Sequence, residues 1–377
     1  MPRFRFLKNL ATLTILTVVY FFAGKLGLRL AFANPSATAV WPPTGIAFAA
    51  FLIIGYWVWP SILLAAFLTN LTTAGSVATS ISIAVGNTLE GMLGAYLVNR
   101  FAGGRRFFDR TQDLFKFVFL AAMVSTMVSA TCGVASLTLG GFAKWADYRA
   151  VWLTWWLGDA AGDLVVAPWL ILWAVSARVA WNKGRLAEAA ILLLCLFWMG
   201  QVVFGGLFPS QVKNYPLEFL CIPVLIWVAF RFGQREAATA IFLLSGIAIR
   251  GTLLGFGPFA RPAQNESLLL LQAFMGITSV MIVALATVVS QHKRAEAGRE
   301  TLILDLQEAL SRIKTLKGLL PICAACKKIR DDKGYWNHIE SYIRKHSEAE
   351  FTHGICPSCA QKLYPEDYAT AGKESGP

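Results

Sequence analysis

The stretch Val151-Trp-Leu-Thr-Trp-Trp-Leu-Gly-Asp-Ala-Ala-Gly-Asp-Leu-Val-Val-Ala-Pro168 decides the fold class, because it joins the apolar composition of a membrane span to two carboxylates. Asp159 and Asp163 are four residues apart, so they lie on one helical face, and each follows a glycine that lets a neighbouring helix come close. A carboxylate in hydrocarbon costs roughly 2.5–3.5 kcal/mol on the membrane-insertion scale, so such residues usually face a bundle interior or a water-filled cavity. The alternatives are a solvated helix end, or protonated and hydrogen-bonded acids.

The composition extends this interpretation to most of the chain. Of the 377 residues, 56% are hydrophobic and only 15% are charged, which is too apolar for a soluble domain. The formal net charge is +12. Most of the basic excess precedes Ser290, where it is typical of membrane orientation and contact with anionic lipid rather than of nucleic-acid binding. We therefore predict an all-α polytopic membrane bundle.

The number of spans follows from the apolar runs. Those long enough to cross a hydrocarbon core about 30 Å thick lie near 8–30, 114–139, 151–176, 187–207 and 267–290. Shorter or paired runs lie near 44–59, 60–73, 77–99, 215–231 and 235–255. We predict 8–10 transmembrane helices, because the pair split at Trp59-Pro60 could instead be one broken span or a re-entrant hairpin. Lys and Arg concentrate in alternate loops, which predicts cytoplasmic N- and C-termini.

Other polar residues also lie at apparent membrane depth. Glu90 and Arg250 have few polar neighbours in sequence, and charges in hydrocarbon tend to pair. We therefore predict that Arg250 pairs with Glu90 or with one of the aspartates. The turn at Trp41 is either plain turn chemistry or part of an outward-facing pocket. The candidate ligand-binding residues are Asp159, Asp163, Glu90, Arg250, Asn87 and Trp41.

Short motifs along the apolar region stand in an order that resembles a known family. They are Trp41-Pro-Pro-Thr-Gly45, Gly86-Asn-Thr-Leu-Glu90, Trp155-Trp-Leu-Gly-Asp159, Ala167-Pro168, Pro223 with Trp227 and Arg231-Phe-Gly233, and Gly257-Pro-Phe259. The ordered set covers roughly residues 10–290 and resembles the first membrane-associated sensor family (MASE1). That family is the integral-membrane sensory domain of bacterial sensor histidine kinases and diguanylate cyclases. The resemblance implies a multi-pass sensory domain over 1–290 in a bacterial inner membrane, and it implies no ligand.

A helix is predicted to leave the membrane after Gln291, where hydrophobicity falls. Its apolar residues follow a heptad spacing, at Leu302, Leu306, Ala309, Ile313, Leu316 and Leu320. Residues 291–320 therefore form either a coiled-coil-like signalling helix, which would make a homodimer, or a helix packed on the module that follows. Both alternatives stay open.

Two Cys-x-x-Cys pairs follow, Cys323 with Cys326 and Cys356 with Cys359. Two residues between thiols let both sulfurs reach one tetrahedral Zn²⁺ at about 2.3 Å, and two such pairs complete a structural site. A reducing cytoplasm makes metal a better explanation than disulfides. We predict structural Zn²⁺ bound by these four cysteines.

The cysteines define a small C-terminal module over 321–366, with a disordered tail over 367–377. We predict an α+β, treble-clef-like fold, with Trp336 on one face of a helix together with Tyr342. The segment also resembles the short four-cysteine tail of some bacterial PAS-containing kinases and response regulators, a resemblance that implies no specific function.

The functional expectation combines these parts. The residues after Ser290 show no kinase glycine boxes, no Gly-Gly-Asp-Glu-Phe cyclase signature and no phosphoacceptor domain. We expect a non-enzymatic inner-membrane sensor or signalling adaptor, embedded in the lipid bilayer, that relays to a cytoplasmic kinase or cyclase. The alternative is an ion- or proton-coupled transporter, which buried acids and Gly/Pro-broken spans also suit. No nucleic-acid partner is expected, because the basic run Lys327-Lys-Ile-Arg330 is too short.

Overall fold

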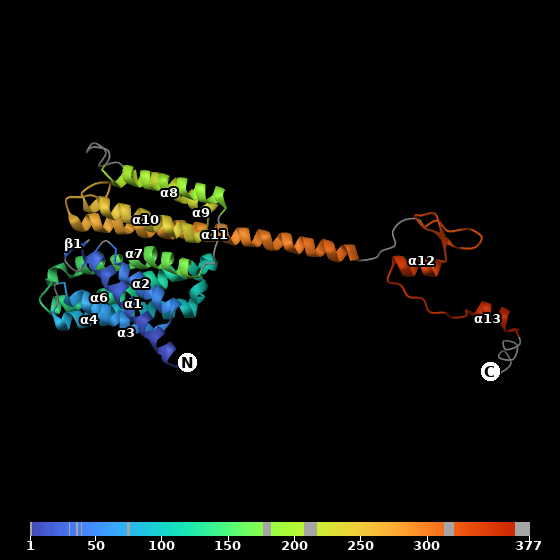
Figure 1. Cartoon of the computed structure of the whole chain (residues 1–377), viewed down its shortest axis with the longest axis horizontal. Coiled ribbons are helices and arrows are strands. Elements are labelled where there is room, and N and C mark those ends of the chain that lie inside the picture. Colours follow the sequence, from blue (N-terminus) through green and yellow to red (C-terminus); the bar gives the residue numbers. More distant parts are fainter. Residues whose placement is uncertain are drawn as a thin grey trace, which may run out of the picture. The chain divides into compact units, whose positions relative to one another are not determined.

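The computed structural model (Figure 1) describes residues 2–29, 31–34, 37–38, 40–73, 76–175, 182–206, 217–312 and 320–365. They form two compact units, Met1–Arg294 and Ala295–Pro377. The described part of the first unit is almost entirely helical, as its composition predicts. The described part of the second holds the end of a long helix followed by a small module with two short strands.

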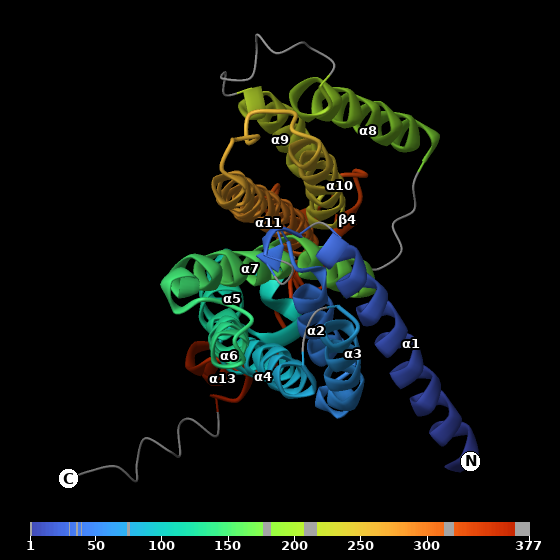
Figure 2. The same ribbon diagram turned by 90° about the vertical axis from the view of Figure 1, so that its left-hand side faces the viewer.

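The first unit is a helical bundle with one short hairpin of strands. Its elements in chain order are α1 (Pro2–Arg29), β1 (Ala31–Asn34), β2 (Ala37–Thr38), α2 (Pro42–Ile53), η1 (Tyr56–Val58), α3 (Trp59–Leu71), α4 (Val77–Phe101), η2 (Gly104–Asp109), α5 (Thr111–Phe117), η3 (Val118–Ser125), α6 (Thr126–Leu139), η4 (Trp145–Asp147), α7 (Tyr148–Val175), α8 (Lys183–Phe204), η6 (Leu217–Leu220), α9 (Cys221–Arg231), α10 (Gln234–Leu253) and the first part of α11 (Gln264–Arg312). β1 and β2 pair antiparallel. Figures 1 and 2 show α7 lying between α2 on one side and α11 on the other.

Seven helices in the described part of the chain are long and apolar enough to cross a membrane, so the chain is a multi-pass membrane protein. They are Phe6–Arg29, Val77–Phe101, Thr111–Leu139, Trp145–Val175, Lys183–Phe204, Gln234–Leu253 and Gln264–Leu310. The prediction of 8–10 spans is not confirmed. Three of the predicted runs are the short helices α2, α3 and α9, of 12, 13 and 11 residues. At about 1.5 Å per residue each is shorter than a hydrocarbon core of roughly 30 Å.

The short helices α2 and α3 run antiparallel to one another. The backbone N–H of Trp41, just before α2, donates to the carbonyl of Gly158 on α7 at 2.9 Å. At the other end of α2, the Arg105 guanidinium donates to the carbonyls of Leu52 at 2.9 Å and Ile53 at 2.6 Å. The last carbonyls of a helix have no partner within it, so Arg105 satisfies acceptors that hydrocarbon could not.

Lys25 donates hydrogen bonds at the C-terminal end of α3, as Arg105 does at that of α2. Its ammonium donates to the carbonyl of Thr72 at 2.8 Å and to the hydroxyl of Thr73 at 2.9 Å, just past the last turn of α3. At the opposite end of α3, the Ser61 hydroxyl donates to the carbonyl of Leu13 on α1 at 2.9 Å. α3 therefore runs parallel to α1, with polar contacts at both ends.

Glycines bring α2 and α7 into close contact. Gly158 and Gly162 are four residues apart on α7, a small-residue pattern that lets backbones approach. A Cβ atom on Gly162 would collide with the carbonyl oxygen of Trp41, and one on Gly45 would collide with that of Gly162. The sequence around the two aspartates therefore determines where α2 begins.

α11 is one continuous helix of 49 residues. Its first part is packed in the bundle, with Leu268, Leu271 and Ile282 buried. In the second unit Leu302 and Leu306 of the predicted seam are exposed on the single chain. Residues 313–319, with Ile313 and Leu316, lie outside the described residues, so both interpretations of the seam stay predictions.

The module at the end of the chain has α+β content. β3 (Ile329–Arg330) pairs antiparallel with β4 (Trp336–Asn337), and α12 (Ile339–His346) and α13 (Pro357–Leu363) follow. Trp336 therefore lies in a strand, and the helix begins only at Ile339. The Asp331 carboxylate accepts the N–H groups of Lys333 and Tyr335 and folds the turn between β3 and β4. The predicted tail over 367–377 lies outside the described residues.

Candidate functional site

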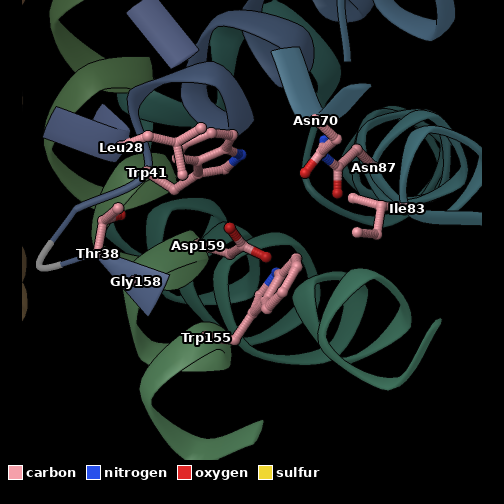
Figure 3. Close-up of a pocket in the computed structure, with 9 residues that line it drawn as sticks. All are labelled: Leu28, Thr38, Trp41, Asn70, Ile83, Asn87, Trp155, Gly158 and Asp159. Carbon is pink, nitrogen blue, oxygen red and sulfur yellow. The ribbon is translucent and has the colours of Figure 1, made fainter. Parts of the chain in front are cut away.

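A small cavity lies beside Asp159, among side chains from α1, α3, α4 and α7 and from the segment before α2 (Figure 3). Its lining residues are Leu28, Thr38, Trp41, Asn70, Ile83, Asn87, Trp155, Gly158 and Asp159. The volume is about 10 Å³, which is roughly the room that one water molecule requires. The structure thus brings Asp159, Asn87 and Trp41 of the predicted site to one place.

Asp159 is the charged residue of this cavity. Its side chain is 1% exposed, and the Thr44 hydroxyl donates to Oδ1 at 3.2 Å. Oδ2 has no hydrogen-bond partner among the described residues. Figure 3 shows the carboxylate beside the rings of Trp155 and Trp41. A buried carboxylate with one unsatisfied oxygen is a costly arrangement.

A chain of buried hydrogen bonds runs from the cavity across four helices. The Trp155 indole N–H donates to the Ser129 hydroxyl at 3.2 Å, and that hydroxyl donates to Oδ1 of Asn87 at 2.7 Å. The Asn87 amide in turn donates to the Tyr20 hydroxyl at 3.4 Å. These bonds join α7, α6, α4 and α1 through buried side chains.

Glu90 and Asp163 lie in the same electrostatic neighbourhood as Asp159. Each is 1% exposed. Both carboxylate oxygens of Glu90 and Oδ1 of Asp163 lack a hydrogen-bond partner in the part of the chain described. Like charges in a medium of low dielectric repel strongly, so the three acids are not all ionised together unless positive charge compensates them.

Arg250 does not supply that charge. It is exposed in the last turn of α10 and lines a separate cavity of about 330 Å³ together with Gln201. The predicted pairing with Glu90 or an aspartate is therefore not found. The reason is the orientation of α10, which buries the face that carries Ile241 and Ala248 and turns Arg250 outward. A cation is favourable at a helix C-terminus, and its long side chain can reach the interface.

Sequence reasoning missed Gln272, which connects α11 to the wall of the cavity. Its side-chain N–H₂ donates to the carbonyl of Thr38 at 3.0 Å and to that of Thr154 at 3.0 Å. Thr38 lines the cavity, and Thr154 precedes the lining residue Trp155. Further along α11, the Ser279 hydroxyl donates to the carbonyl of Leu164. The sequence signal for Gln272 was its isolated amide side chain in the apolar run 267–290. For Tyr20, Thr44 and Ser129 the sequence offered no comparable signal, since hydroxyl residues are common in such helices.

The first cysteine pair lies in a turn, and the second lies at the start of α13. The N–H of Lys327 donates to the carbonyl of Cys323 at 3.0 Å, and the N–H of Cys359 donates to that of Cys356 at 3.0 Å. Hydrogen bonds from the backbone N–H groups of Cys326 and Ala325 lower the pKa of Cys323. The Ser358 hydroxyl, with the N–H of Cys359, lowers that of Cys356 to about 7. Thiolates are the form that binds metal.

The structure does not bring the two pairs together. Over residues 320–365 and the other described ranges, no group of three or more His, Cys, Asp or Glu side chains is placed to hold a metal ion. The zinc-bound treble clef is therefore not shown. The donor set nevertheless fits Zn²⁺, since four thiols in two Cys-x-x-Cys pairs match its tetrahedral preference. Zn²⁺ stays a prediction.

The comparisons with known proteins agree with the membrane architecture. The family model of MASE1 matches residues 12–293, which is well over half of the chain. No curated protein and no solved structure matches the chain. The matched range begins within α1, contains the cavity at Asp159 and ends near the boundary of the first compact unit. The chain belongs to the MASE1 family of membrane sensory domains.

Proposed function

We propose that the chain is a non-enzymatic sensor of a bacterial inner membrane, which binds a small ligand at Asp159 and relays the change through α11 to its cytoplasmic C-terminal segment. One observation carries this proposal. Gln272 on α11 donates one amide hydrogen to the carbonyl of Thr38, which lines the cavity, and the other to that of Thr154, next to the lining residue Trp155. The sensory family, which the match over residues 12–293 shows, supports the same function.

The Gln272 contact couples the cavity to the exit helix. A ligand shifts a conformational equilibrium only through contacts that differ between the two states. Occupancy at Asp159 would displace Thr38 or Trp155, and the first of these movements acts directly on a carbonyl that Gln272 holds. Because α11 continues without a break from Gln264 to Arg312, a shift near Gln272 is not absorbed by a hinge.

A second set of contacts holds α11 at the opposite end of the bundle. The Gln291 amide donates to the carbonyl of Asp109 at 2.9 Å, and the Arg294 guanidinium contacts the carboxylate of Asp109 at 2.8 Å. Lys293 donates to the carbonyl of Phe230 at 2.7 Å. The ion pair is exposed, and such pairs contribute about 0–1 kcal/mol. These contacts are therefore weak enough to break when the buried anchor at Gln272 moves.

The charge pattern supports a cytoplasmic position for this end. Arg105 and Arg294 lie at the end of the bundle where α11 contacts Asp109, together with the basic loops of the sequence. Cytoplasmic loops of membrane proteins carry an excess of Lys and Arg. In this arrangement the C-terminal module, stabilised by Zn²⁺, would contact a cytoplasmic kinase or cyclase.

Hydrogen exchange of the full-length protein in nanodiscs tests the relay. We expect Asp159→Asn to change the exchange rates of α11 beyond Arg294, because a buried charge beside the carbonyl contacts of Gln272 is removed. Asp147→Asn is the matched control, since Asp147 is exposed just before α7. An unchanged α11 in Asp159→Asn would contradict the proposal, and so would the same change in both variants.

The second candidate function is an ion- or proton-coupled transporter. The three buried acids favour it, since such residues mark ion pathways in membrane proteins. Flux into liposomes separates the two functions. Transport by the wild-type protein that is lost in Asp163→Asn would favour a carrier, whereas a relay to α11 without flux would favour the sensor.

A further inference from the structure

The charges around Asp159 in the bundle interior are not balanced. The titratable groups that interact electrostatically with Asp159, in the part of the chain that the structure describes, are Glu90 on α4, Asp163 on α7 itself and Tyr20 on α1. None of them is a cation. The side chains that α2, α3, α6 and α11 add nearby are Thr44, Asn70, Ser129 and Gln272, which carry no charge.

From this geometry we infer that the site at Asp159 takes up one small monovalent cation, either Na⁺ held in the cavity or a proton bound directly to the Asp159 carboxylate. The inference names the ligand class of the sensing site, and it rests on the proposed function for the role of that site. Oδ2 has no hydrogen-bond partner among the described residues, and Asp159, which is 1% exposed, lines a space of about 10 Å³. That space admits one water-sized particle.

The lining suits positive charge. The Asn70 side-chain N–H₂ donates to the carbonyl of Ala66 at 2.9 Å, which leaves its oxygen as an acceptor. Figure 3 shows Asn70 and Asn87 lining the cavity that Asp159 faces. The site therefore combines the carboxylate of Asp159 with the amide oxygen of Asn70.

Other ligand classes fit less well. An anion would be repelled by three acids, and an organic metabolite is far larger than about 10 Å³. A divalent ion such as Ca²⁺ takes six to eight oxygen ligands, often from several carboxylates. In the described ranges no three acidic, His or Cys side chains are placed around one metal position. A single positive charge of water size remains.

Thermal unfolding of the full-length protein in detergent, followed by tryptophan fluorescence, tests the inference. One arm varies NaCl against KCl and N-methylglucamine chloride at constant ionic strength, and the other varies pH without sodium. If Na⁺ binds, we expect a saturable rise of the unfolding temperature by a few degrees that KCl does not reproduce. If the proton binds, we expect a pH-dependent transition that is the same in all three salts.

Asp159→Asn should abolish the response in whichever arm shows it, and Asp147→Asn should keep it. Without sodium and at high pH, Asp159→Asn should unfold at a higher temperature than the wild type, because an uncompensated buried charge is gone. If Asp159→Asn does not fold, Thr44→Val and the direct binding of radiolabelled sodium to the wild-type protein provide the test. Equal behaviour of wild type and Asp159→Asn in both arms would overturn the inference.

The inference and the proposed function fail in different ways. A cation response that leaves hydrogen exchange of α11 unchanged would refute the relay and keep the cation site. An α11 that responds to Asp159→Asn, in a wild-type protein insensitive to both sodium and pH, would keep the relay and refute the cation site.

Discussion

The close packing of α2 on α7 predicts that Gly162→Ala lowers the stability of the protein. The new Cβ would collide with the backbone carbonyl oxygen of Trp41. A flexible side chain could rotate away, but a backbone atom requires the whole start of α2 to move. Overpacking a well-packed core costs about 1–3 kcal/mol, and a backbone obstacle places this site near the upper end. Replacing glycine by alanine in a helix returns about 1 kcal/mol. We expect a net loss of about 2 kcal/mol of unfolding free energy.

Gly246→Ala is the matched control. Gly246 lies in α10, and a Cβ there would meet no atom within 4 Å. The helix preference alone predicts a gain of up to about 1 kcal/mol, so the two variants should differ by roughly 3 kcal/mol. Reversible unfolding in mixed micelles, followed by fluorescence of the 13 tryptophans, measures the difference. A Gly162→Ala protein as stable as Gly246→Ala would refute the close packing of α2 on α7.

Three further predictions concern other parts of the chain. Arg105→Met leaves the last carbonyls of α2 without a donor and should lower the unfolding free energy by about 2 kcal/mol in the same assay, whereas a neutral effect would mean that water replaces the guanidinium. Gln272→Met loses two hydrogen bonds of about 0.6 kcal/mol each and removes an unpartnered oxygen that costs about 1–3 kcal/mol, so its unfolding free energy should equal that of the wild type or exceed it by up to about 2 kcal/mol. It should nevertheless abolish the response of α11 to Asp159→Asn in hydrogen exchange, and a retained response would contradict the coupling; the exposed Gln307→Met should have no effect. The full-length protein should bind one Zn²⁺, measured by metal analysis after exhaustive dialysis, and Cys323→Ser should lose it; equal zinc in both would contradict the four-thiolate site.

The membrane architecture and the buried acids could be predicted because both depend on local sequence. An apolar run long enough to span must be helical, and acids four residues apart in such a run share a face. Asp159 is therefore buried as expected. The identity of its neighbours was only partly accessible. Thr44, Ser129 and Tyr20 come from three other helices, and which of them meet depends on rotations that apolar helices do not encode by periodicity alone.

Arg250 illustrates a signal that was present and not used. The buried positions Ile241, Leu244 and Ala248 define one face of α10. Arg250 is two residues past Ala248, which is about 200° around a helix with roughly 100° per residue. Its outward position follows from this spacing, whereas the prediction that Arg250 pairs with a buried acid considered charge alone. The prediction of 8–10 spans is not confirmed, because runs such as 44–59 and 60–73 fold into helices shorter than a typical span.

The continuity of α11 has a consequence for how such a protein can be recombined. A helix carries an angular phase, which advances by about 100° with each residue. A junction placed between Ala295 and Arg312 therefore joins a sensory bundle to a new output in a fixed rotational register. Inserting about seven residues nearly restores that register, while inserting two turns the output to the opposite side. Chimaeras built at this junction should accordingly alternate between responsive and silent with the periodicity of the helix, whatever domain is attached.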